Sequence, residues 1–226
     1  PSYAELALDA KQKPQQVVKI LKQKFESVVR PYSKQHAVDF GDSYGKFASF
    51  PNYEDSNFAW TFNGATFYSN ITAFVPEIVP LEDCKPNEDT ALPTIHCDWR
   101  RTRYYVCHLF MFNGKDLKLE SVSRLNILRD RKQLVGLPMC FGPQAMAVAK
   151  IIPDAMLITL SYVDSAEPAD PRNLPPEFYT TVLLRFSNEN GKLKIEQDDS
   201  CLGNPNNYKT IAAARKALTK CAVVQK

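Results

Sequence analysis

The dipeptide Asn63-Gly64 constrains the fold of this chain more than any other feature, because aromatic residues alternate with small or polar ones on both sides of it. An Asn-Gly pair suits a two-residue turn, whose central positions need a positive φ. Such a turn sets the register of the two flanking strands. The pairs that it places opposite one another are Phe62 with Ala65, Trp60 with Phe67, and Phe58 with Ser69. The pattern therefore predicts a β-hairpin with one aromatic face.

The opposite face of this hairpin carries mostly polar side chains, namely Thr61, Thr66, Tyr68 and Asn70. Asn70 also opens the tripeptide Asn70-Ile71-Thr72, which matches the acceptor pattern for N-linked glycans. We therefore expect this face to meet solvent, and a glycan on Asn70 to point outward.

A second Asn-Gly pair, Asn113-Gly114, predicts a second hairpin. It joins a strand over residues 103–112 to a return strand over residues 115–128. The expected pairs are Phe110 with Leu117 and His108 with Leu119.

A third hairpin is predicted near the end of the sheet region. Residues 179–187 and 192–197 read as strands, and residues 188–191 connect them. Residues 155–163 read as a further apolar strand. Hairpins with few helices between them predict an antiparallel sheet that is curved or closed into a barrel.

Helices are predicted on both sides of this sheet region. Residues 14–29 carry apolar side chains at helical spacing, and Pro31 is expected to end this helix. Asn207 is the predicted cap of a final helix that runs to Cys221. The residues expected to face inward from that segment are Tyr208, Ile211, Ala212 and Leu218.

These elements predict an α+β fold in a single domain over residues 1–226. Residues 1–31 form its helical N-terminal segment, residues 36–200 its antiparallel curved sheet or barrel, and residues 204–222 its C-terminal helix. A chain of 226 residues is long enough to bury a core of this kind in one domain.

The cysteines are even in number and none of them forms a C-x-x-C pair, which favours disulfides over zinc or thiol redox chemistry. They are Cys84, Cys97, Cys107, Cys140, Cys201 and Cys221. The chain also begins at Pro1 without an initiator Met, as expected of a form that has lost a signal peptide. Together with the sequon, these features predict a secreted protein. The pairings considered are Cys97–Cys107, Cys84–Cys97 and Cys201–Cys221.

Gly41-Asp42-Ser43-Tyr44-Gly45 matches the G-x-S-x-G pattern of a nucleophilic serine. With Phe40 before it, the segment resembles the first block of the GDSL (SGNH) esterase family. The resemblance implies Ser43 as nucleophile and an Asp-x-x-His late in the chain, whereas no histidine follows His108. Serine esterase activity therefore stays an alternative, and no catalytic residue is predicted.

Other function classes are disfavoured by composition and spacing. His96-Cys97 and Cys107-His108 contain metal-ligating types, but adjacent strand residues point to opposite faces, so no metal site is predicted. The net charge of +3 is too small to predict nucleic-acid binding. No apolar run reaches the roughly 18 residues of a membrane span. The mild charge permits assembly into an oligomer.

The abundance of aromatic residues on strands predicts a cavity for a hydrophobic ligand, bound without a covalent cofactor. The predicted ligand-binding residues are Phe58, Trp60, Phe62, Phe67, Tyr104, His108 and Phe110. Gly45-Lys46-Phe47 resembles the Gly-x-Trp signature of lipocalins, which implies a barrel that encloses such a ligand.

The function expected from sequence is therefore that of a secreted, non-enzymatic carrier of a lipid, retinoid, bilin or carotenoid. The alternatives are a secreted interaction or storage protein without a ligand, and a serine esterase that uses Ser43.

Overall fold

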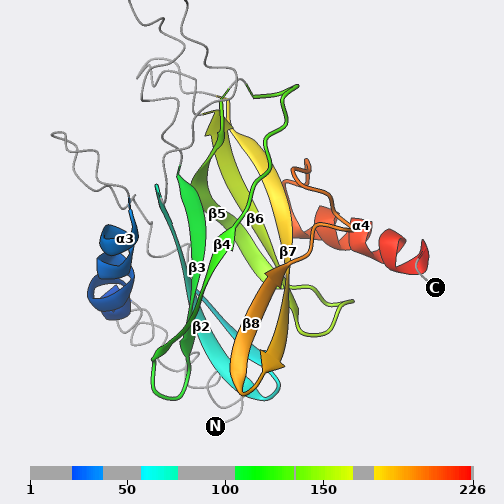
Figure 1. Cartoon of the computed structure of the whole chain (residues 1–226). Coiled ribbons are helices and arrows are strands. Elements are labelled where there is room, and N and C mark those ends of the chain that lie inside the picture. The colour runs from blue at the N-terminus through cyan, green and yellow to red at the C-terminus, as the bar shows by residue number, and fades with distance from the viewer. Residues whose placement is uncertain (1–21, 38–56, 76–104, 135, 165–175, 225–226) are drawn as a thin grey trace, which may run out of the picture.

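The computed structural model describes residues 22–37, 57–75, 105–134, 136–164 and 176–224. These residues form two antiparallel sheets of four strands each, with helices beside them (Figure 1). The N-terminal sheet has the order β1-β2-β3-β4, and its strands are β1 (Asn57–Phe62), β2 (Ala65–Phe74), β3 (Val106–Asn113) and β4 (Leu119–Leu125). The C-terminal sheet has the order β5-β6-β7-β8, and its strands are β5 (Pro138–Val148), β6 (Ala155–Asp164), β7 (Phe178–Glu189) and β8 (Lys192–Gln197).

The two sheets pack face to face as a β-sandwich. Alternate residues of each sheet meet in one buried cluster, which includes Trp60, Phe62, Ile71, Leu109 and Met111 on one side, and Met156, Ile158, Leu160, Val182 and Leu184 on the other.

The prediction of an α+β, mainly antiparallel fold is confirmed in this coarse form. No strand pairing among the described residues closes the sheets into a barrel, so the lipocalin-like architecture is not confirmed. The two sheets instead bury their apolar faces against each other.

A helix covers the outer face of each sheet, so the described residues form four layers (Figure 1). The π-helix η1 (Phe25–Val29) and helix α3 (Arg30–His36) lie over the N-terminal sheet, where Phe25 and Val29 join a buried cluster with strand aromatics. Helix α4 (Ile211–Val224) lies over the C-terminal sheet, and its Ala214 and Leu218 are fully buried there.

The prediction that Pro31 ends the first helix is wrong, because the helical backbone continues to His36. Pro31 lies in the first turn of α3, directly after η1. Within η1 the amide of Arg30 donates to the carbonyl of Phe25, five residues back, which widens the turn. A wider turn relieves the clash that a proline ring otherwise makes with the preceding turn.

The predicted register of the first hairpin is confirmed at every predicted pair, with Trp60 opposite Phe67 across β1 and β2. The hairpin of β7 and β8 is also confirmed, and Asn190 and Gly191 form its turn with φ values of 54° and 79°. In both hairpins the positive φ angles fall on Asn and Gly, which tolerate them best.

The predicted register between β3 and β4 is wrong. His108 faces Arg124 and Phe110 faces Val122, because the loop is longer than two residues. The amide of Asn113 donates to the carbonyl of Lys118, and the amide of Gly114 donates to Thr66 of the neighbouring hairpin. The contact with Thr66 holds Gly114 against β2, so the chain turns later.

Two other elements differ from expectation. The sequence pattern does not predict strand β5, which contains Pro138 and Pro143; its position at the edge of the sheet and its bulges tolerate both prolines. Thr210, not Asn207, caps α4, because its hydroxyl accepts from the amide of Ala213 at 3.2 Å. Ala212 is exposed, contrary to the prediction, because the packed face of α4 follows Ile211, Ala214 and Leu218 at helical spacing; Leu218 is buried as expected.

Candidate functional site

The predicted ligand-binding residues are divided between two cores. Trp60, Phe62 and Phe67 lie between the sheets, whereas His108 and Phe110 lie on the opposite side of the N-terminal sheet, Phe110 in the cluster beneath η1 and α3. The cause is the alternation of β3, whose intervening residues point into the sandwich. These side chains therefore do not line one common cavity. Tyr104 and the side chain of Phe58 lie outside the described residues.

The aromatic residues between the sheets contact one another closely. The ring of Trp60 lies 4.0 Å from that of Phe186 and 5.7 Å from that of Phe67, measured between centroids. All three side chains are buried. This part of the structure is a packed core that holds the two sheets together.

His108 is buried on the face of β3 that lies toward the N-terminal helices. Its ring stacks on Phe74 at 4.0 Å, and its Nδ1 donates to the carbonyl of Val106 at 2.9 Å. Burial is the main cause that lowers the pKa of His108 from 6.5 to about 4. The hydrogen bond to Val106 opposes this shift, whereas the charges of Arg124 and His36 add to it.

The expectation that the polar face of the first hairpin meets solvent is wrong. Asn70 is only 2% exposed and Tyr68 only 6%, because this face is covered and Tyr68 joins the cluster beneath η1 and α3. The outward direction predicted for a glycan on Asn70 therefore loses its basis. The sequence pattern defines which residues share a face of the hairpin. It does not show that a helix from another part of the chain covers that face.

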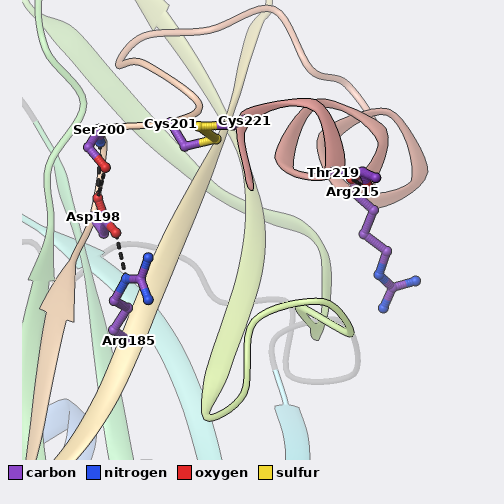
Figure 2. The surroundings of a disulfide bond; sticks show 7 residues. All are labelled: Arg185, Asp198, Ser200, Cys201, Arg215, Thr219 and Cys221. Carbon is purple, nitrogen blue, oxygen red and sulfur yellow. Dashed lines mark hydrogen bonds and ion pairs between the residues drawn. A yellow bond between two sulfur atoms is a disulfide. The ribbon is translucent and has the colours of Figure 1, made fainter. Parts of the chain in front are cut away.

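Two disulfides are described. Cys201–Cys221 confirms the predicted bridge between the segment after β8 and the helix α4 (Figure 2). Beside it, Asp198 accepts from Arg185 and Ser200 (Figure 2).

Cys107 bonds to Cys140, so the considered Cys97–Cys107 pair is wrong. The physical reason is the fold itself, which brings β5 beside β3 although 33 residues separate the two cysteines. The amide of Cys140 also donates to the carbonyl of Tyr105 at 2.8 Å. This disulfide and this hydrogen bond join β3 and the residue before it to β5, an edge strand of the C-terminal sheet. Cys84 and Cys97 lie outside the described residues.

A pocket of about 190 Å³ opens beside the Cys107–Cys140 disulfide, where the segment after β4 meets the start of β5. We name it the β4–β5 pocket. Its lining is mainly apolar and comprises Tyr105, Val106, Arg124, Leu125, Asn126, Ile127, Leu128, Arg129, Leu137, Pro138 and Cys140. Apolar walls with a few polar groups are typical of small-molecule sites.

Hydrogen bonds hold one wall of this pocket in place. The amide of Asn126 donates to Oε1 of Gln197 at 2.9 Å, and Nε2 of Gln197 donates back to the carbonyl of Asn126 at 2.9 Å. Asn204 also donates to the same carbonyl at 2.8 Å, and its side-chain oxygen accepts from the amide of Leu128. The segment after β4 is therefore fixed to the C-terminal sheet by side chains more than 70 positions away in sequence.

Sequence reasoning missed this pocket. It assigned the residues after Leu125 to a long return strand and did not predict β5, so the two walls could not be brought together. Knowledge of the Cys107–Cys140 pairing would have indicated the pocket. The spacing of the cysteines in the sequence does not specify this pairing.

Several other sequence predictions are not tested. Ser43 and the segment Gly45-Lys46-Phe47 lie outside the described residues.

Within the described ranges, no group of three or more His, Cys, Asp or Glu side chains is placed to hold a metal ion. No helix of the described residues has the length and hydropathy that crossing a bilayer requires.

No protein-family model, curated protein or solved structure matches this chain.

Proposed function

We propose that this protein is an extracellular, non-enzymatic carrier that binds a small apolar molecule in the β4–β5 pocket. The observation that carries the proposal is the pocket itself, a cavity of about 190 Å³ with a mainly apolar lining. The disulfides Cys107–Cys140 and Cys201–Cys221 support the extracellular setting, since such bonds persist in oxidising compartments.

The volume of the pocket supports a ligand smaller than the retinoids and bilins expected from sequence. An apolar cavity of about 150 Å³ holds one benzene ring, whereas sites for drug-sized ligands measure about 300–1,000 Å³. A pocket of 190 Å³ lies just above the first value. The proposed ligand is therefore a molecule with one or two rings, or an aliphatic group of similar size.

The rigidity of the walls supports reversible binding without a large rearrangement. The Cys107–Cys140 bond fixes β3 to β5, and the hydrogen bonds of Gln197 and Asn204 fix the segment after β4. A preformed pocket loses little conformational entropy when a ligand enters.

Equilibrium dialysis with naphthalene-2-carboxamide tests the proposal, because this neutral two-ring probe matches the size and polarity of the pocket. The full chain with intact disulfides should retain the probe. Leu137→Trp, which adds bulk to the lining, should abolish retention. Ile151→Trp is the matched control, since Ile151 is 43% exposed and does not line the pocket.

Absence of binding by the unmodified chain, to this probe and to its carboxylate analogue, would overturn the carrier function. The packed aromatic core between the sheets would then favour the alternative of an interaction protein without a ligand.

A further inference from the structure

The charge on the lining of the β4–β5 pocket has one sign. Arg124 and Arg129 are both among the lining residues, which include no Asp or Glu. Arg124 is at the end of β4, and Arg129 is in the segment that follows it. The guanidinium groups of these two residues create a positive potential at the part of the mainly apolar cavity that they line.

The position of Arg129 strengthens this argument. Its Nε atom is fully buried although the residue as a whole is only partly buried, and the residue is part of the pocket lining. Guanidinium groups in such partly dry positions bind carboxylates through two parallel hydrogen bonds.

Arg124 lies directly opposite His108 in the pairing of β4 with β3. Its charge is among the causes that lower the pKa of His108, which faces it across β3 and β4. Arg124 therefore carries its charge at the end of the N-terminal sheet that borders the pocket.

Resting on the carrier function above, we infer that the natural ligand is a small apolar ring system that carries one anionic group, with Arg129 as the residue that binds the anion and Arg124 as a contributor to the field. The ring lies against the apolar residues of the pocket, such as Ile127, Leu137 and Pro138. The pocket thereby distinguishes an acid from its neutral amide.

The matched pair naphthalene-2-carboxylate and naphthalene-2-carboxamide tests this inference, since the two probes share one ring system and differ in charge. In equilibrium dialysis at low salt, the carboxylate should bind the unmodified chain about tenfold more tightly than the amide. Added sodium chloride should reduce this preference, because the pocket is open to solvent.

Arg129→Gln should make the affinities for the carboxylate and the carboxamide equal. Arg124→Gln should reduce the difference between these two affinities. Lys132→Gln is the matched control, because it removes one positive charge from an exposed residue that does not line the pocket. It should keep the preference for the carboxylate. If Arg129→Gln does not fold, the comparison of probes and the salt dependence on the unmodified chain still decide the outcome.

The results separate this inference from the proposed function. Equal binding of both probes would overturn the anionic ligand and leave the carrier function standing. A carboxylate preference that survives in both arginine variants would overturn the assignment to Arg129 and Arg124. Binding of neither probe would overturn the carrier function itself.

Discussion

Acidification from pH 7 to pH 5 should weaken the fold through His108. This residue is 7% exposed, and its ring is stacked on Phe74 beneath the N-terminal helices. Burial lowers the pKa of His108 from 6.5 to about 4, so the folded protein keeps the imidazole neutral at pH values where the unfolded chain protonates it.

The sign and size of the effect follow from this difference. Between pH 6.5 and pH 4 the unfolded state binds more protons than the folded state, so the free energy of unfolding falls as the pH is lowered through this window. Each pKa unit corresponds to about 1.4 kcal/mol, so the full shift is worth roughly 3 kcal/mol. About 2 kcal/mol of this should be lost between pH 7 and pH 5.

Urea unfolding at pH 7 and pH 5 measures the loss directly. His108→Gln places an uncharged side chain at this position, so the variant should lose about 2 kcal/mol less than the unmodified chain between the two pH values, whatever its stability at pH 7. His36→Gln removes an exposed imidazole whose charge is the smallest of the causes that act on His108, so this variant should keep most of the His108 contribution. If His108→Gln loses as much stability on acidification as the unmodified chain, the reasoning is refuted.

Three further predictions concern the fold. The double variant Cys201→Ser with Cys221→Ser should lower the free energy of unfolding by about 3 kcal/mol, because the bridge closes a 20-residue loop in the unfolded chain; an unchanged urea midpoint would contradict this. Under mild reduction, iodoacetamide should label the partly exposed Cys201 and Cys221 before the buried Cys107 and Cys140, and peptide mapping that finds the reverse order would count against the packing described for β3 and β5. Gly114→Ala should cost about 1–3 kcal/mol, since a Cβ atom there would lie 2.6 Å from the Thr66 carbonyl oxygen; thermal unfolding should show this loss, and a melting temperature equal to that of the exposed control Lys115→Ala would refute it.

The parts of the fold that could be predicted depend on residues close together in the chain. Asn63-Gly64 and Asn190-Gly191 each determine a turn, and each turn determines the register of its hairpin. The Cys201–Cys221 bridge spans one helix and its approach, so short separation favoured it. Local chemistry is sufficient in all three cases because each turn or bridge joins residues at most 20 positions apart in the chain.

The predictions failed where a distant segment contributes. Asn113-Gly114 has the same dipeptide as the first turn, yet the hydrogen bond from Gly114 to Thr66 and the longer loop change the register of β4. Asn70 lies on a face that is polar in sequence but buried in the structure. The pocket could not be predicted at all, because its walls come from β3, the segment after β4, and the unpredicted β5.

The sequence by itself determined the antiparallel hairpins, the alternation of their faces and the amphipathic helices, because these depend on backbone geometry and on spacings of two and 3.6 residues. Only the tertiary structure decided that the sheets form a sandwich, that helices cover both outer faces, and that Arg129 meets an apolar pocket beside the Cys107–Cys140 bond. The physical reason is that alternation specifies which side chains share a face, whereas burial depends on which distant surface that face contacts.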